Sequence, residues 1–228
     1  MMVFGLSRAI KNAKGNAIIA ELKLYSPKHG DLLRGRNPFD ILRAYERGGA
    51  IAISYITETQ YFRGSMYMLK RICRETELPV LRKDFIRRKK DIEDTAEAGA
   101  SAVLLIARIL KAQLAEFVDL AREHGLDALV EVHTQEEISM ALQTGAAMIG
   151  INNRDIRKLE KDDGDVSLTE KLAPLIPPDC LKVSESGIAT EEQLRRALRV
   201  ADAVLIGTAL MKAENPEKML RSFVEVRI

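Results

Sequence analysis

The sequence predicts an α/β fold, a single (β/α)8 TIM barrel with a short extra helix at its N-terminus. Two observations lead to this prediction. Eight short apolar runs alternate with eight amphipathic patterns along nearly the whole chain, which is the element order of a parallel barrel. The open doubly wound sheet is the rival architecture, but residues 20–30, which follow the first apolar run, lack the glycine-rich fingerprint that usually marks it.

Internal repetition supports the barrel, because four segments of the chain share one plan. Each combines the end of an amphipathic helix, one or two small residues and an apolar run, at residues 44–56, 96–107, 141–152 and 197–208. Three of the four carry Gly-Ala at the join, and a glycine directly after a helix suits a left-handed C-cap. The apolar runs that follow are typical of strands buried on both faces.

Four further apolar runs complete the set of eight strands, at residues 17–22, 78–82, 126–132 and 180–184. The helical patterns are expected at residues 38–48, 64–75, 89–98, 111–124, 134–143, 167–173, 190–199 and 215–224. Thr134 with Glu137 predicts a capping box, and Asn215 precedes a proline at a first helical position. Residues 1–16 form a short extension expected to pack a helix across the barrel bottom, and residues 1–228 are interpreted as one domain.

Composition and charge exclude several classes of protein. Lys and Arg number 35 against 33 Asp and Glu, so the net charge of +2 gives no argument for a nucleic-acid or membrane partner. The two cysteines lie far apart, the three histidines lack metal-ligand spacing, and no apolar stretch approaches the ~20 residues that span a bilayer. The N-terminus does not have the pattern of a signal peptide, so we expect a cytoplasmic protein without a metal site.

Polar residues cluster where the predicted strands end, and both architectures place their chemistry at the carboxyl ends of strands. This set comprises Glu21, Lys23, Lys83, Glu131, Asn152, Arg154 and Glu185. Glu21 and Lys23 lie two residues apart, so both side chains can point into the barrel mouth. Any one of these residues, taken alone, is equally well explained by its position where a strand leaves the core. Their occurrence at the ends of several strands favours a catalytic or binding site.

The loops after the last two strands carry the residue types of a phosphate site. Ser186 and Gly187 follow the seventh strand, and Gly207 and Thr208 follow the eighth. The stretch between Thr208 and Asn215 is long enough for one short helix, whose free N–H groups would face an anion. The simpler alternative is that both glycines serve only as turn residues.

Seven segments, in the same order, resemble the indole-3-glycerol-phosphate synthase family. They are IIAELKLYSPKHG, YFRGS, LPVLRKDF, LVEVHT, IGINNRD, KVSESGI and VLIGTALM, and the resemblance extends over about residues 17–220. It implies a (β/α)8-barrel carboxy-lyase of tryptophan biosynthesis. Such an enzyme closes the indole ring of 1-(2-carboxyphenylamino)-1-deoxyribulose 5-phosphate and releases carbon dioxide and water, with no metal and no organic cofactor.

The resemblance also implies roles for the residues at the strand ends. Lys83 corresponds to the general acid that protonates the substrate carbonyl during ring closure, and Glu131 to the acid/base glutamate of the dehydration. Lys23 corresponds to a lysine near the substrate carboxylate and phosphate, for which a second acid role has been argued. Glu21 corresponds to a carboxylate that orients this lysine. An ammonium in a dry pocket suits this chemistry, because ring closure places charge on a ketone oxygen.

Two further strand-end residues, Asn152 and Glu185, correspond to catalytic-site polar groups around the substrate hydroxyls and amine. The implied substrate-binding positions are Ser26, Phe62, Arg154, Ser186 and Leu205, and the implied phosphate-binding positions are Lys23, Gly187, Gly207 and Thr208. Thr208 stands where the family has serine and keeps the hydroxyl. The implied partner is a small phosphorylated substrate, and we expect a monomer that associates at most weakly with other enzymes of the tryptophan pathway.

Two other functions stay open at this point. A phosphoribosylanthranilate isomerase-like barrel binds a similar phosphate, but its chemistry typically needs a cysteine base at the first strand end, where this chain has Glu21. A non-catalytic barrel that binds a sugar phosphate would not need Lys83 or Glu131, and both are present. Incubating the purified protein with the carboxyphenylamino-deoxyribulose phosphate and following indole fluorescence would distinguish the three functions.

Three secondary expectations concern the rest of the chain. Apart from Lys83, the basic run 82–90 is interpreted as the solvated start of a helix rather than a nucleic-acid patch. His124 and His133 are expected on the surface. Because members of the resembled family usually carry a longer N-terminal extension, closure over the site is expected to be weaker or differently built here.

Overall fold

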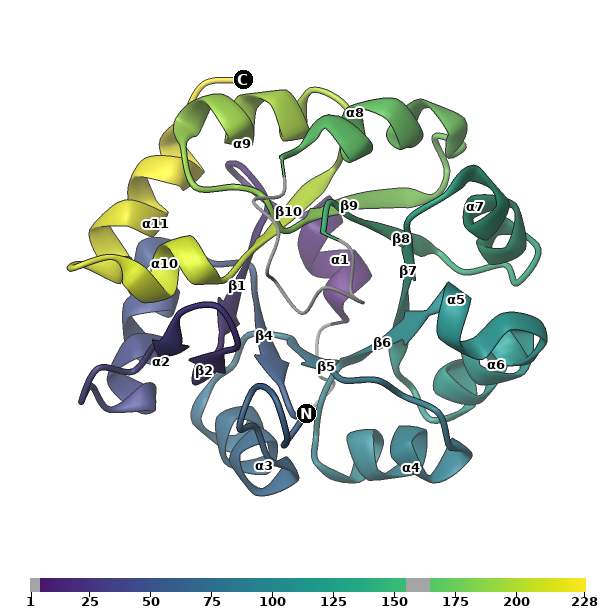
Figure 1. The fold of residues 1–228 in the computed structure, drawn as a ribbon, viewed down its shortest axis with the longest axis horizontal. Coiled ribbons are helices and arrows are strands. Elements are labelled where there is room, and N and C mark those ends of the chain that lie inside the picture. The colour runs from purple at the N-terminus through teal and green to yellow at the C-terminus, as the bar shows by residue number, and fades with distance from the viewer. Residues whose placement is uncertain (1–4, 155–164) are drawn as a thin grey trace.

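The computed structural model describes residues 5–154 and 165–228, and it contains the predicted barrel. Eight parallel strands close in the order β1-β10-β9-β8-β7-β6-β5-β4, with helices around them (Figure 1). The strands are β1 (Ile18–Leu22), β4 (Ala52–Ile56), β5 (Val80–Lys83), β6 (Ala102–Ile106), β7 (Asp127–Val132), β8 (Met148–Asn152), β9 (Leu181–Glu185) and β10 (Ala203–Ile206). The predicted fold class is confirmed.

Each predicted helical pattern coincides with a helix of the outer ring. These helices are α2 (Pro38–Gly48), α3 (Met66–Glu75), α4 (Lys89–Glu97), α6 (Leu114–Glu123), α7 (Gln135–Leu142), α8 (Ser167–Leu172), α9 (Glu191–Leu198) and α11 (Pro216–Glu225). Short additional pieces are α5 (Ala107–Leu110), α10 (Thr208–Lys212) and 3-10 turns at Lys111–Gln113 and Ala173–Leu175. A two-stranded ribbon, β2 (Tyr25–Ser26) with β3 (Gly30–Asp31), lies in the loop after β1.

Helix α1 (Leu6–Lys11) closes the lower end of the barrel, as predicted for the N-terminal extension. Leu6 and Ile10 are buried in the same apolar cluster as inward residues of the strands, such as Ile19 and Leu129. The helix is also tied to the barrel by polar contact, because the Ser7 N–H donates to Asp127 Oδ2 at 2.8 Å. In Figure 1, α1 is seen through the centre of the ring of strands.

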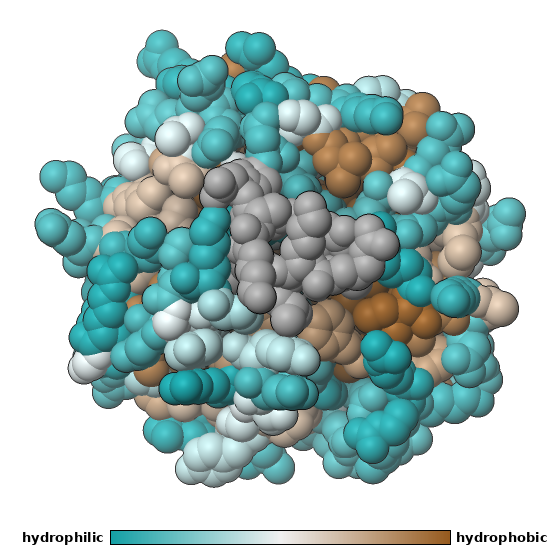
Figure 2. Space-filling view, viewed as in Figure 1, coloured by the Kyte–Doolittle hydropathy of each residue, from teal (hydrophilic) through white to brown (hydrophobic). Residues whose placement is uncertain are grey.

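Alternation along each strand divides the core into an inner and an outer layer. In β1, Ile19 belongs to the barrel interior, whereas Ile18 and Ala20 pack with the surrounding helices. The visible outer surface is largely hydrophilic, with apolar side chains in smaller patches, one of them beside β6 and α5 (Figure 2). No helix in the described ranges is both long and apolar enough to cross a membrane.

Most predicted capping signals are present. Gly49, which follows α2, has φ 90°, and Asn215 Oδ1 accepts the Lys218 N–H at 2.9 Å. Thr134 caps α7 as expected, since its hydroxyl accepts the Glu137 N–H. The second hydrogen bond expected of that capping box, from the Thr134 N–H to the Glu137 carboxylate, is wrong. The carboxylate instead accepts the N–H of His133, the residue before Thr134.

Candidate active site

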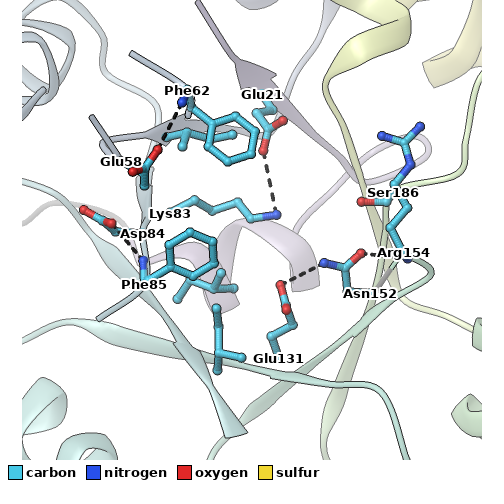
Figure 3. Close-up of a pocket in the computed structure, with 13 residues that line it drawn as sticks. Glu21, Glu58, Phe62, Lys83, Asp84, Phe85, Glu131, Asn152, Arg154 and Ser186 are labelled. Carbon is cyan, nitrogen blue, oxygen red and sulfur yellow. Dashed lines mark hydrogen bonds and ion pairs between the residues drawn. The ribbon is translucent and has the colours of Figure 1, made fainter. Parts of the chain in front are cut away.

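The predicted polar residues converge at one end of the barrel. Lys83, Asn152 and Glu185 end β5, β8 and β9, and Glu131 lies next to the last residue of β7. Because the strands are parallel, their carboxyl ends share one mouth. There Lys83, Glu131 and Asn152 join Glu21 of β1 in lining a hollow (Figure 3).

The ammonium of Lys83 is held between two carboxylates. Its Nζ lies 2.9 Å from Glu185 Oε2 and 3.7 Å from Glu21 Oε2. Burial on its own lowers the pKa of Lys83, but the charges of the surrounding glutamates, Glu185 foremost, outweigh burial and raise this pKa above its ordinary value. Lys83 is therefore protonated at neutral pH and can donate a proton to a bound ligand.

Glu185 is fully buried beneath this ammonium. Burial raises the pKa of Glu185 from 4.5 to about 7, although the charge of Lys83 opposes the shift. The carboxylate has room because the facing residue of β8 is a glycine: a Cβ on Gly150 would lie 2.0 Å from Glu185 Oε1. The charge of Glu185 therefore changes near neutral pH, next to the proton donor.

The second lysine lies on the other side of Glu21. Lys23 Nζ lies 3.4 Å from Glu21 Oε1 and donates to Thr208 Oγ1 at 2.9 Å. Glu21 thus contacts both lysines, which spaces two positive charges across the mouth. Gly207 leaves room for it, since a Cβ there would lie 2.2 Å from Glu21 Oε1.

Glu131 faces the same hollow with one oxygen engaged and one open. Its Oε2 accepts the Asn152 Nδ2–H at 3.1 Å, while its buried Oε1 has no hydrogen-bond partner in the described part of the chain. Asn152 is fixed in turn, because its Oδ1 accepts the Arg154 N–H at 3.1 Å. The nearest ring nitrogen, His133 Nε2, lies 3.6 Å from Oε1, which is beyond hydrogen-bond distance, so this oxygen can still accept a hydrogen bond from a ligand.

An apolar wall completes the hollow opposite these polar groups. It is formed by Ile56, Phe62, Phe85, Leu104 and Ile106. Phe62 lies in the loop after β4, which Glu58 holds in place by accepting the N–H groups of Tyr61 at 2.7 Å and Phe62 at 3.0 Å. Figure 3 shows the rings of Phe62 and Phe85 on either side of the Lys83 side chain. A planar aromatic ligand fits such a wall.

A second hollow adjoins the first and contains the predicted phosphate residues. Lys23, Ser186, Gly187, Gly207 and Thr208 all line it. The short helix expected after the eighth strand is present as α10, which begins at Thr208. The lining thus supplies an ammonium, hydroxyls and loop N–H groups, which are the donors that a phosphate group accepts.

The remaining predicted site residues lie at different distances from the two hollows. Arg154 lines both hollows, and Leu205 of β10 lines the second. Ser26 lies in β2, is fully buried and accepts the Lys28 N–H at 3.3 Å, and it lines neither hollow. Within the described residues, no cluster of three or more His, Cys, Asp or Glu side chains could hold a metal ion.

Comparison with known proteins places this geometry in a family. Residues 4–223 match the family model described as indole-3-glycerol phosphate synthase. The chain belongs to this family. Proteins of the same name are 72% identical in Thermococcus kodakarensis, over 227 residues, and 70% identical in Pyrococcus furiosus, over 228 residues, with 100% of both chains covered in each case.

A solved structure shows the same fold in a distant protein. Thiamine phosphate pyrophosphorylase from Pyrococcus furiosus superposes with a TM-score of 0.68 at 17% identity, covering 96% of each chain. At that identity the likeness concerns the barrel alone. The indole-3-glycerol phosphate synthase resemblance inferred from seven short segments is confirmed, and neither alternative function is favoured by these matches.

Sequence reasoning missed several residues of the site. Phe85 and Glu58 line the hollow, yet only the motif around Phe85 was noticed. The expectation that His133 lies on the surface is wrong, because its side chain is 5% exposed with Nε2 3.6 Å from Glu131 Oε1. Arg82 likewise departs from the solvated run: it is buried and its Nε donates to Thr57 Oγ1 at 2.9 Å. For Arg82 the available signal was a charged residue within an apolar strand, and for His133 it was a position directly after a buried strand.

Proposed function

We propose that the chain catalyses the reaction for which its family is named. The enzyme converts 1-(2-carboxyphenylamino)-1-deoxyribulose 5-phosphate to indole-3-glycerol phosphate, carbon dioxide and water. The observation that carries the proposal is the position of Lys83. Its protonated amine forms ion pairs with Glu185 and Glu21, and its side chain lies between two aromatic rings and opposite Glu131 (Figure 3). The reaction shifts protons and electron pairs without net oxidation, so acid–base side chains can supply its chemistry.

Ring closure is assigned to Lys83. The aromatic carbon that bears the carboxylate attacks the ketone carbon, a carbon–carbon bond forms, and the ketone oxygen takes the proton of the Lys83 ammonium. The neighbouring glutamates keep this amine protonated and fix its direction before substrate binds. A positioned proton donor of this kind typically contributes 10²–10⁴-fold. Carbon dioxide then leaves, and its bonding electrons restore the aromatic ring.

Dehydration is assigned to Glu131. The hydroxyl made from the ketone takes up a proton and leaves as water, and the ring carbon between the amine and that position loses a proton, so that the double bond of the indole forms between the two carbons. Glu131 Oε1 has no hydrogen-bond partner in the described residues, and Asn152 holds the other oxygen. The carboxylate can thus accept one proton and return another at the leaving hydroxyl.

Binding is divided between the two hollows. The aromatic wall with Phe62 takes the carboxyphenyl ring, and the hollow lined by Gly187, Gly207 and Thr208 takes the phosphate. Lys23 lines the second hollow, and its Nζ contacts Thr208 there and Glu21, a residue that lines both hollows. The partner is then a small phosphorylated molecule, handled by a monomeric, single-domain enzyme in the cytoplasm.

One experiment tests the proposal. Purified protein is mixed with the carboxyphenylamino-deoxyribulose phosphate, and indole fluorescence is followed. The chain contains no Trp, so its own emission interferes little. Appearance of indole product supports the proposal, and a properly folded protein that produces none contradicts it.

A further inference from the structure

Asn153, the residue after β8, lies at the centre of a hydrogen-bond cluster that the proposed mechanism does not use. Its Nδ2 group donates to Ser184 Oγ at 3.1 Å, to the Glu185 carbonyl at 3.0 Å and to the Ser186 carbonyl at 3.0 Å. Its own N–H donates to the same Glu185 carbonyl at 2.9 Å. One side chain therefore holds three successive residues at the end of β9.

The amide of Asn153 is fixed from the opposite side by α8. Its Oδ1 accepts both the N–H and the hydroxyl of Thr169, each at 3.0 Å, and Thr169 is fully buried. These contacts settle which end of the amide faces which partner. The reverse orientation would place the amide oxygen against two backbone carbonyls and the amide nitrogen against an N–H.

The segment held by Asn153 has an unusual backbone. Ser186 has φ 66° and Gly187 has φ 76°, so two consecutive residues are left-handed. Glycine adopts this conformation freely, but for serine it is unfavourable unless the surroundings impose it. Hydrogen bonds from Asn153 to the carbonyls on both sides of the Ser186 N–H are such an imposed constraint.

This conformation links the two halves of the site. Just before the turn, the Glu185 carboxylate contacts Lys83 Nζ at 2.9 Å. Just after it, Gly187 lines the hollow assigned to phosphate. A relaxation of Ser186 to negative φ would redirect the chain between these two points.

We infer that Asn153 is a positioning residue that imposes the left-handed turn at Ser186 and thereby sets both the Glu185–Lys83 contact and the phosphate-binding loop. The inference rests on the proposed function for its catalytic consequence, but its structural consequence is independent of turnover. Strain held at a functional site by surrounding contacts is a recurrent arrangement.

The first test compares Asn153→Ala with Thr169→Val as the matched control. The control removes the Thr169 hydroxyl, and with it the contacts to Asn153 Oδ1 and Ser184 Oγ, but it keeps all donors toward Ser186. Crystal structures should show residue 186 outside the left-handed region in Asn153→Ala only. Inorganic phosphate, titrated calorimetrically, should bind about tenfold more weakly to Asn153→Ala, the effect of losing one or two buried hydrogen bonds, and within about twofold of wild type to the control.

The second test asks whether Asn153 acts through the backbone of residue 186. In a Ser186→Gly background the left-handed turn no longer depends on imposed contacts, so Asn153→Ala should weaken phosphate binding by less than about threefold there. Asn153→Asp, which keeps the acceptor for Thr169 but presents oxygens to two carbonyls, should be at least as damaging as the alanine variant in the wild-type background.

Either of two results would overturn the inference: residue 186 still left-handed in the Asn153→Ala crystal structure, or equal loss of phosphate affinity in both backgrounds. Should the alanine variant not fold, the double variant with Ser186→Gly, which relieves the strain, supplies the structural comparison. None of these readouts needs turnover. A wild-type enzyme without indole product would therefore refute the proposed reaction while leaving the inference about Asn153 to be decided on its own data.

Discussion

Replacing Gly150 by alanine tests the packing that positions the proposed proton donor. Gly150 lies in β8, facing the buried carboxylate of β9, and a Cβ there would lie 2.0 Å from Glu185 Oε1. The carboxylate must retreat by about 1.4 Å to reach ordinary contact distance. Glu185 is fully buried and cannot yield toward solvent, so the movement comes at the expense of its 2.9 Å contact with Lys83.

The expected loss follows from the strength of that contact. A hydrogen bond between charged groups contributes about 1.5–3 kcal/mol, so kcat/KM for the Gly150→Ala enzyme should fall by roughly 10–100-fold if the contact serves the transition state. Indole fluorescence under steady-state conditions measures this directly. An overpacked methyl costs about 1–3 kcal/mol of folding stability, which lowers the melting temperature by roughly 2–12 °C for a domain of this size, so the variant should stay folded in the assay.

Gly125→Ala is the matched control for Gly150→Ala. Gly125 has φ 72° and open space around its Cβ position, and it lies before β7, at the end of the barrel away from the mouth. This substitution strains the backbone and lowers stability but should leave kcat/KM unchanged. Wild-type kcat/KM in Gly150→Ala, with the pH profile unmoved, would refute the claim that the Glu185–Lys83 contact positions the acid.

Three further predictions concern the same site. Lys83→Ala should lower kcat by at least about a hundredfold with a far smaller change in substrate affinity, because proton donation acts in the transition state; near-normal turnover would remove Lys83 from this role. A sulfate or phosphate ion in a crystal should contact the N–H groups of Gly187, Gly207 or Thr208, and an anion bound only by the exposed side chains of residues 87–90 would count against that placement. The pKa of Glu185 is raised from 4.5 to about 7, so kcat/KM should fall as the pH is lowered below about 7. Folding stability should fall as the pH rises from 4.5 to about 7, because the folded protein binds this proton more tightly than the unfolded chain does. Glu185→Gln should lose both pH dependences.

The fold was accessible from the sequence because its signals are local and repeated. A helix end such as Gly49, a cap such as Asn215 and a continuous apolar run such as residues 17–22 each depend on a few neighbouring residues. Eight repetitions of that information leave little room for another architecture. The short helix at Thr208 was expected because the loop is long enough to hold one.

The site was only partly predictable from the sequence, because the burial of a polar side chain depends on how its partners are folded against it. His133 is buried because Glu131, Glu137 and the Arg154 carbonyl surround it, and only β8 and α7 bring these together. Arg82 points outward from its strand to α4, where its Nη1 donates to the Asp91 carbonyl at 2.8 Å. Several of these partners are close in sequence, but only the folded chain turns them toward His133 and Arg82.

Backbone conformation was the other feature of the site that could not be predicted from the sequence. The glycine that accommodates Glu185, Gly150, lies mid-strand in an apolar run and gives no local sign of its purpose. Ser186 carries no signal for a left-handed φ, since serine rarely adopts one, and the amide that holds it belongs to Asn153, the residue after β8. The close contacts of Gly150 with Glu185 and of Asn153 with Ser186 therefore become apparent only once the pairing of β8 with β9 is known.

The central claim is the division of labour between Lys83 and Glu131, and a single-turnover experiment on Glu131→Gln tests it most directly. Substrate labelled in its carboxylate allows carbon dioxide release to be followed beside indole fluorescence. The variant keeps the shape of the side chain but cannot exchange a proton, so the first turnover should release carbon dioxide while indole formation slows by roughly 10²-fold or more. Indole formation at the wild-type rate would contradict the account and leave Glu131 as an orienting residue, with the acid/base role moved to Glu21 or Glu185.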